Sequence, residues 1–105
     1  VTESNSQTGT SKLISGSPAI VVAIQAINTT AAAAYVQLFD AKSVADITLG
    51  TTIPRWVVKS QANDVSENHF VPTNGITFRK GIVVASTTTP LNATGASQHV
   101  RIAIV

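Results

Sequence analysis

The chain has 105 residues, no cysteine and a formal net charge of +2, and only 11% of its residues are charged. This length suits one domain with its own buried core, the missing cysteines exclude disulfides and thiolate metal sites, and the small net charge gives no reason to predict nucleic-acid binding. Because charged residues make up about 25% of an ordinary soluble domain, we expect other subunits to cover much of this neutral surface.

The first 18 residues are rich in Ser, Thr, Asn and Gly and have little to bury apart from Leu13 and Ile14. This composition predicts a flexible, extended N-terminal arm over residues 1–18, with one short anchoring stretch at Leu13 and Ile14. Two interpretations stay open at this point. The arm is either a disordered tail or a segment that becomes ordered on a neighbouring subunit.

The pattern changes after Pro18, where β-branched residues begin to dominate. The segment Ala19–Asn28 alternates loosely between two largely apolar faces, which predicts a strand buried on both sides. The segment Ala34–Asp40 predicts a second strand, with two faces made by Tyr35, Gln37 and Phe39 and by Val36 and Leu38. A long loop should follow and end at Pro54, because proline is tolerated at the first position of a strand.

The segment Arg55–Ser60 predicts the next strand, with Trp56 and Val58 pointing inward and Arg55 and Lys59 outward. Residues 61–68 are polar and turn-like, and a short extended piece begins at His69.

The Asn74–Gly75 pair predicts a β-hairpin, since both residues accept positive φ angles. The strand after it is interrupted by Gly81, which we interpret as a bulge or bend beside a solvated Arg79–Lys80 shoulder rather than as a phosphate-binding loop. The last strand covers Gln98–Val105, with Val100, Ile102 and Ile104 on its core face. Its terminal residue should be tied into a sheet, since it would otherwise expose an apolar edge.

About seven strands, joined by turn signals and accompanied by no convincing helix, predict an all-β fold. We expect an antiparallel β-sandwich, either jelly-roll-like or a small barrel, over residues 19–105.

The sequence lacks the residue patterns typical of enzymes and metal sites. His69 and His99 lie on separate segments, and Asp64 and Glu67 lack the glycine and alternating oxygen ligands of a calcium loop. The Gly-x-Ser-x-Gly nucleophile motif is absent. We predict that the protein is not an enzyme and holds no cofactor or metal. A small hydrolase that uses His69 or His99 is the weakest alternative.

Targeting signals are also missing. No basic segment precedes an apolar run near the start of the chain, and no apolar run approaches the ~20 residues that a membrane-spanning helix needs. We expect no secretory signal and no membrane partner, and synthesis in a cytoplasm. Asn28 and Asn92 each begin a glycosylation sequon, but without a secretory signal we interpret both as loop asparagines.

Three segments between residues 19 and 89 resemble a group of small β-sandwich virion proteins of tailed bacteriophages. The shared outline is an aromatic-x-Leu-aromatic strand, a Gly-Thr-x-x-Pro turn and a Phe-Pro-x-Gly-Leu-x-Phe-x-x-Gly-Ile-x-x-Ala segment. In this chain the Phe-Pro spacing is longer by one residue. The outline is carried by Tyr35, Leu38, Phe39, Gly50, Thr51, Pro54, Phe70, Pro72, Gly75, Ile76, Phe78, Gly81, Ile82 and Ala85.

The resemblance implies a structural virion protein on the capsid surface. It would be a capsid decoration (cement) protein, or a fibre or tail accessory, whose partners are the major capsid protein and neighbouring copies of itself in a trimer or another homo-oligomer. The alternative function is a carbohydrate- or receptor-binding module of a phage fibre or tail, which would expose Trp56 or Tyr35 as a stacking platform. We expect Trp56 to lie in the core instead.

The candidate partner-binding residues are two apolar and four basic side chains, namely Leu13, Ile14, Arg55, Lys59, Arg79 and Lys80. Together with Arg101, the basic residues either gather on one sheet face, where they would contact an acidic capsid surface, or lie scattered as ordinary solvated cations. Contact with nucleic acid is the weaker interpretation of a gathered face, because no aromatic residues are interleaved among the cations.

Overall fold

A computed structural model describes residues 2–8, 11–69, 71–89 and 97–105 of the chain. The described residues form nine strands and one short 3-10 turn, η1 (Val44–Asp46), so the predicted all-β class is confirmed. The strands are β1 (Thr2–Thr8), β2 (Lys12–Ser15), β3 (Ala19–Asn28), β4 (Ala34–Asp40), β5 (Trp56–Ser60), β6 (Asp64–His69), β7 (Ile76–Phe78), β8 (Ile82–Thr87) and β9 (Ser97–Ile104).

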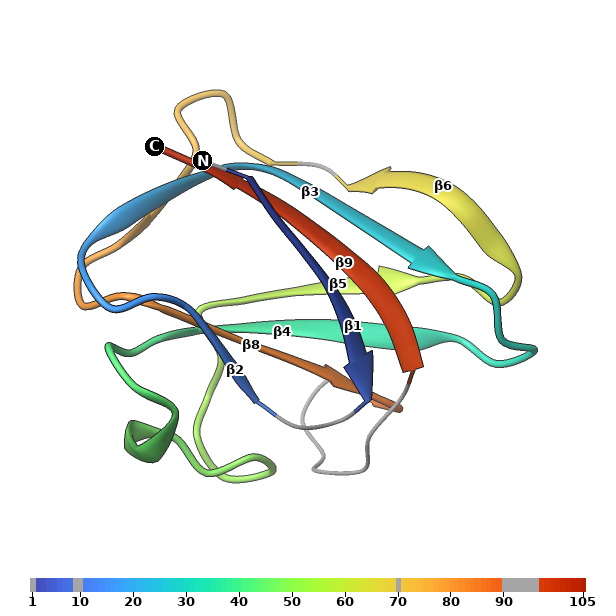
Figure 1. Cartoon of the computed structure of the whole chain (residues 1–105), viewed down its shortest axis with the longest axis horizontal. Helices are drawn as coiled ribbons and strands as arrows, with labels where there is room; N and C mark the ends of the chain where they lie inside the picture. The colour runs from blue at the N-terminus through green and yellow to red at the C-terminus, as the bar shows by residue number, and fades with distance from the viewer. Residues whose placement is uncertain (1, 9–10, 70, 90–96) are drawn as a thin grey trace.

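The strands form two antiparallel sheets that face each other as a sandwich (Figure 1). One sheet has the order β1-β9-β3-β6, with β7 also pairing with β3, and the other has the order β2-β8-β4-β5. Seven of these strands, β3 to β9, come from the segment in which about seven were predicted. The predicted antiparallel sandwich is therefore confirmed.

The pairing follows the path of a jelly roll. The early strands pair with the late ones, β1 with β9 and β2 with β8, while β3 pairs with β6 and β4 with β5. Two further pairings, β3 with β9 and β4 with β8, complete the two sheets. This is one long antiparallel ribbon wrapped into two sheets, the arrangement of a double-sheet jelly roll.

The segment expected to be a flexible arm, residues 1–18, contributes the first strand of each sheet. The pairing of β1 with β9 runs without interruption from Thr2↔Ala103 to Thr8↔Ser97. The sandwich therefore begins before Pro18 instead of after it. The prediction missed these strands because their polar residues carry no apolar alternation, whereas strand pairing uses backbone groups that nearly every residue has.

The main core lies between the two sheets, and a smaller second core covers the outer face of the four-stranded sheet. The second core consists of Phe39, Ala41, Val83 and Ala85, with Ile47 and Leu49 of the loop after β4 packed onto it. The main core consists of Ala19, Val21, Ile24, Ala26, Val36, Leu38, Val58, Ile76, Phe78, Ile82, Val84, Val100 and Ile102.

Strands β4 and β8 are buried on both faces because the second core covers their outer side. All six residues of β8 are buried, and so are five of the seven residues of β4. The prediction placed this property on β3, which was wrong, because Val22 and Ala23 of β3 are exposed to solvent. Its outer face is rich in β-branched residues because these residues fit a pleated strand even where one face is open.

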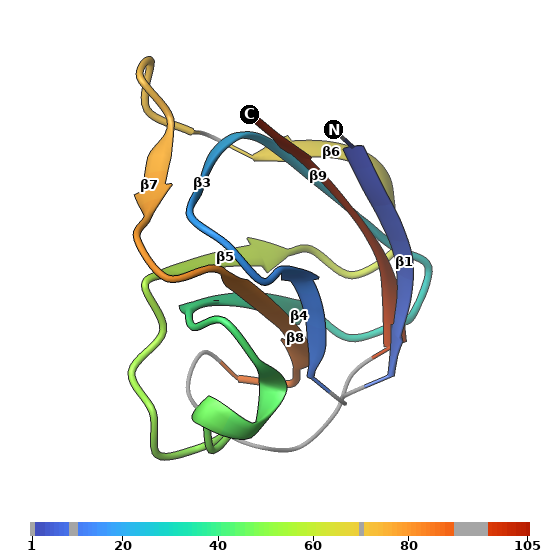
Figure 2. The ribbon, with the colours of Figure 1, turned by 60° about the vertical axis from the view of Figure 1, so that its left-hand side comes forward.

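The predicted hairpin at Asn74–Gly75 is a turn but not a hairpin. Gly75 has a φ of 78°, and its amide donates a hydrogen bond to the carbonyl of Pro72 at 2.8 Å. However, β6 and β7 on either side of the turn both pair with β3 and run in the same direction. Strands β6 and β7 therefore follow one another along the same side of β3, and residues 71–75 form a loop between them (Figure 2). The Asn74–Gly75 pair correctly predicted a positive φ angle, but it did not determine which strand the flanking strands pair with.

Strand β6 lies in residues that were predicted to be turn-like. Its bounds are Asp64–His69, and it pairs with β3 from Ile24↔His69 to Asn28↔Asp64. The turn itself is confined to the residues before the strand, where Asn63 has a φ of 56°. As with β1, a polar strand gave no alternation signal.

The predicted bend at Gly81 is the point where the chain crosses between the sheets. Strand β7 before it belongs to the five-stranded sheet, and β8 after it belongs to the four-stranded sheet. Gly81 is buried, and Arg79 and Lys80 beside it are exposed. At the end of the chain, Val105 is tied to Ile20 by two backbone hydrogen bonds of 3.0 and 3.1 Å, as predicted for this terminal residue.

Candidate functional site

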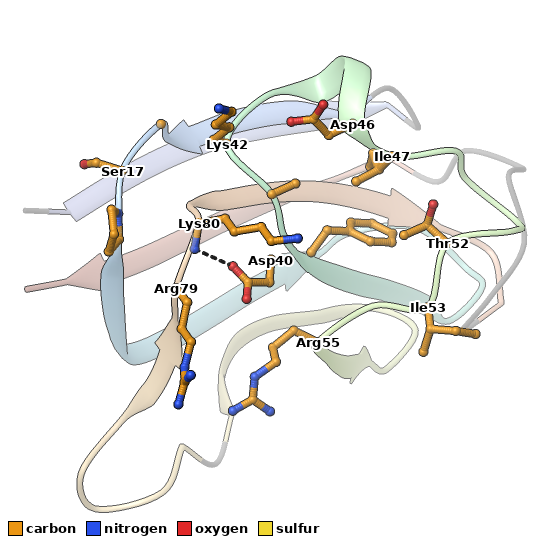
Figure 3. Close-up of a pocket in the computed structure, with 14 residues that line it drawn as sticks. Ser17, Asp40, Lys42, Asp46, Ile47, Thr52, Ile53, Arg55, Arg79 and Lys80 are labelled. Atoms are coloured by element: carbon orange, nitrogen blue, oxygen red, sulfur yellow. Dashed lines mark hydrogen bonds between the residues drawn. The ribbon is translucent and has the colours of Figure 1, made fainter.

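A pocket of about 910 Å³ lies at one end of the sandwich, where the connections between strands converge. We call it the corner pocket (Figure 3). The segments that form its walls lie at the left end of the molecule in Figure 1, below the C-terminus. Its walls come from the β2–β3 connection, the end of β4, the loop after β4 and the β7–β8 crossing, and consist of residues 16–18, 39–42, 46–47, 52–53, 55 and 79–80.

Two hydrogen bonds attach the walls of the corner pocket to the end of β4. The backbone amide of Lys80 donates to Asp40 Oδ1 at 2.8 Å, and the backbone amide of Arg55 donates to the carbonyl of Leu38 at 2.7 Å. Asp40 thus receives a loop amide, a role that acidic residues often take at turns. Both basic wall segments are held against the same strand end.

The loop that forms the third wall is ordered by its own contacts. The amide of Thr48 donates to Thr52 Oγ1 at 2.9 Å, and the amide of Thr52 donates to the carbonyl of Thr48 at 2.8 Å. Ile47 and Leu49 from this loop pack onto the second core. Compact loops closed by their own side chains are frequently functional.

The corner pocket carries more positive than negative charge. It is lined by the cations Lys42, Arg55, Arg79 and Lys80 and by the two carboxylates Asp40 and Asp46, which leaves an excess of two positive charges. All four cations are exposed. Figure 3 shows the Arg55 and Arg79 side chains leaving different wall segments and extending in the same direction.

Beside the corner pocket lies a smaller pocket of about 400 Å³, here called the apolar pocket. It is lined by Pro18, Ala19, Ile20, Thr77, Phe78, Arg79 and Val105. Pro18 and Arg79 line both pockets, so the two adjoin. Val105 at the edge of one and Ile53 at the edge of the other are each 76% exposed. One end of the sandwich therefore presents an apolar surface that continues into a basic pocket.

The structure brings together three of the four basic residues that the sequence singled out. Arg55, Arg79 and Lys80 line the corner pocket, while Lys59 lies exposed on β5 outside it. Arg101 is on β9, in the other sheet. The sequence interpretation missed Lys42. The available signal was its place two residues after the end of β4, in the loop that leads to Arg55.

The two apolar candidates have different surroundings. Ile14 is half-buried and packs against the main core, so the predicted anchoring stretch does anchor to the sandwich at this residue. Leu13 is 42% exposed on the edge strand β2. It is the freer of the two for contact with a partner.

Trp56 is half-buried and packs against the main core, whose members include Phe78. This agrees with the expected core position. Tyr35 is also half-buried. Half-buried rings offer a sugar less stacking surface than the exposed platform that the alternative function predicts.

Asn28 is not a loop residue, contrary to the prediction. It is the last residue of β3 and has no exposed surface. Both polar atoms of its side chain form hydrogen bonds: Nδ2 donates to the carbonyl of Ala32 at 2.8 Å, and Oδ1 accepts from the amide of Thr30 at 3.0 Å. A sequon buried in this way does not offer its amide nitrogen in the folded protein. Asn92 lies outside the described residues.

The side chains of His69, His99, Asp64 and Glu67 lie outside the part of the chain whose side chains are described. Among the described residues, no group of three or more histidine, aspartate or glutamate side chains is placed to hold a metal ion. In the same residues, no helix has the length and hydropathy required to cross a membrane.

Comparison with known proteins gives no relatives: no protein family, no curated protein and no solved structure matches this chain.

Proposed function

We propose that the protein is a non-enzymatic structural virion protein, a capsid decoration protein that binds and stabilises the lattice of major capsid proteins. Its partners are the major capsid protein and neighbouring copies of itself. The proposal starts from the resemblance to small phage virion proteins. It is supported at the level of fold by the jelly-roll path, since viral capsid domains are among the proteins that use it.

The observation that carries the proposal is the pair of adjoining pockets at one end of the sandwich. Protein interfaces typically combine an apolar centre with arginine. The apolar pocket supplies the accessible side chains of Ile20 and Val105, and Arg79 lies where it meets the corner pocket. On a chain with 11% charged residues, a surface of this kind suits a protein partner.

Elementary energetics show why such a protein needs no reactive group. A standard interface buries about 1,600 Å², and removing apolar surface from water contributes about 25 cal/mol per Å² before the costs of association. A protein that binds only the assembled lattice stabilises that lattice by mass action. Each bound copy adds its own interface.

The direct test is a binding titration on undecorated capsids of the phage that encodes this chain. Purified protein should co-sediment with the capsids and saturate at a fixed number of copies per capsid subunit. Unassembled capsid protein serves as the control and should bind much less. Failure of the protein to bind capsids at any concentration up to saturation of the assay would overturn the proposal.

A further inference from the structure

We propose that the corner pocket is a docking site for an acidic segment of the partner protein, in which Arg55 and Arg79 bind carboxylate groups. This inference rests on the proposed function, because the partner is taken to be the capsid protein. It adds the chemistry of recognition, namely which end of the sandwich binds and what kind of segment it accepts.

The first argument is the unneutralised charge of the pocket. The Asp40 carboxylate already accepts the Lys80 amide, while the side chains of Arg55 and Arg79 have no carboxylate partner within the described part of the chain. A guanidinium group presents a planar fork of donors that matches a carboxylate in two parallel hydrogen bonds. Two such groups from different walls favour an anion that enters between those walls.

The second argument distinguishes an acidic peptide from a nucleic acid. Because Asp40 and Asp46 lie in the same pocket, its excess of only two positive charges suits an anion with few charges better than a run of phosphates. The pocket also has apolar walls at Ile47 and Ile53, and its volume of about 910 Å³ lies within the usual range of ligand-binding clefts. A polypeptide segment carries both carboxylates and apolar groups, whereas a nucleic-acid backbone offers phosphate at every step.

The third argument is that the pocket is formed before the partner arrives. The backbone of Arg55 is bonded to Leu38 at 2.7 Å, and the crossing that carries Arg79 is held by the 2.8 Å bond from Lys80 to Asp40. Binding then costs less ordering of the backbone, which is the benefit of preorganisation. Arg79 also borders the apolar pocket, the kind of central position where arginine often dominates binding energy.

Charge reversal tests the site on the capsid. Arg55→Glu and Arg79→Glu should each weaken capsid binding by at least about tenfold, since each leaves a partner carboxylate facing a like charge. Arg101→Glu makes the same chemical change at an exposed position in the other sheet and should bind like the unaltered protein. Thermal unfolding of all three variants verifies that they fold.

A second arm does not depend on the capsid. The arginine side-chain Nε–H signals are followed by NMR while tetraglutamate, tetraglutamine or a short oligothymidylate is added. Tetraglutamate should shift the signals of Arg55 and Arg79 and leave that of Arg101 in place, and tetraglutamine should shift none of them. A stronger response to oligothymidylate than to tetraglutamate would overturn the choice of an acidic peptide.

The two arms separate the failure of the site from the failure of the function. If the unaltered protein binds capsids and the Arg55 and Arg79 variants bind as well as Arg101→Glu, the docking site is wrong and the decoration function stands. If tetraglutamate selects Arg55 and Arg79 but the protein never binds capsids, the site stands and the capsid partner is wrong. If tetraglutamate moves all three arginine signals alike, the pocket has no selectivity and the inference fails.

Discussion

Gly81 lies where the chain crosses from one sheet to the other, and its surroundings leave no room for a side chain. A Cβ atom at this position would lie 2.4 Å from the carbonyl oxygen of Ser15 and 2.6 Å from that of Ala41. Both obstacles are backbone atoms, which cannot rotate away. The close approach lets the crossing pack under the β2–β3 connection and the end of β4, which are two of the walls of the corner pocket.

The substitution Gly81→Ala should therefore lower the free energy of unfolding by about 1–3 kcal/mol, the usual cost of forcing extra volume into a packed site. Gly16→Ala is the matched control, because its Cβ would meet nothing closer than 3.6 Å; it should leave stability unchanged or raise it by up to about 1 kcal/mol. Urea denaturation of both variants measures the difference. Equal stability of the two variants would contradict the crossing geometry.

The side chain of Asn28 holds the path of the chain after β3. Replacing it with alanine removes the acceptor for Thr30 and the donor for Ala32. The half-buried Thr30 amide then has no acceptor, which costs about 1–3 kcal/mol, whereas the Ala32 carbonyl still accepts from Thr30 Oγ1. The denaturation midpoint of Asn28→Ala should fall accordingly, while Thr29→Ala at the exposed neighbour should stay within about 0.5 kcal/mol of the unaltered protein. A midpoint for Asn28→Ala that matches Thr29→Ala would show that these bonds do not stabilise the turn.

At the scale of elements, the outermost strands distinguish this fold from a sandwich with a loose arm. Strand β1 covers the edge of β9 in one sheet, and β2 covers the edge of β8 in the other. Without them, two long interior strands would become open edges, which are prone to pair with other chains. The polar sequence of β1 suits an edge strand.

Deletion of residues 1–8 should expose this edge in a recognisable pattern. Successive residues of an antiparallel strand direct their amides to opposite neighbours, so about half of the β9 amides bond to β1 and the rest to β3. Amide hydrogen exchange should show loss of protection at alternate β9 residues in the truncated protein, with protection kept at those that face β3. Unchanged protection along β9 would mean that β1 does not pair there.

How far the elements could be predicted depended on their apolar content. The bounds of β3 and β4 agree with the predicted Ala19–Asn28 and Ala34–Asp40 because alternating β-branched and aromatic residues mark them. Strands β1 and β6 pair through backbone groups that nearly every residue has, and their polar sequences gave no such signal. Gly81 was predicted to be a bend, but only strand pairing determines that the bend joins two sheets.

The candidate site shows the same limit. Arg55, Arg79 and Lys80 were singled out as basic residues next to strands, but their approach to one another depends on the antiparallel pairing of β4 with β8, which places Asp40 opposite Ile82. Lys42 joins them only because the loop after β4 folds back. Contacts between residues far apart in sequence follow from topology, which a local pattern does not contain.

At the scale of the whole molecule, the low charge and the adjoining pockets at one end both suit contact with other protein subunits. A rigid jelly roll holds an apolar pocket and a basic pocket next to each other, and few charges elsewhere oppose contact with neighbouring subunits. Such a molecule would act by binding an assembled lattice. Its effect should therefore appear as stability of the lattice.

The thermal stability of the capsid is the most direct measure of that effect. Calorimetry of undecorated capsids with increasing amounts of this protein should show a melting temperature that rises and then levels off at the stoichiometry of binding. At a free concentration of 100 times the dissociation constant, each site should gain about 2.7 kcal/mol. A capsid melting temperature that stays the same at saturating protein would contradict the account.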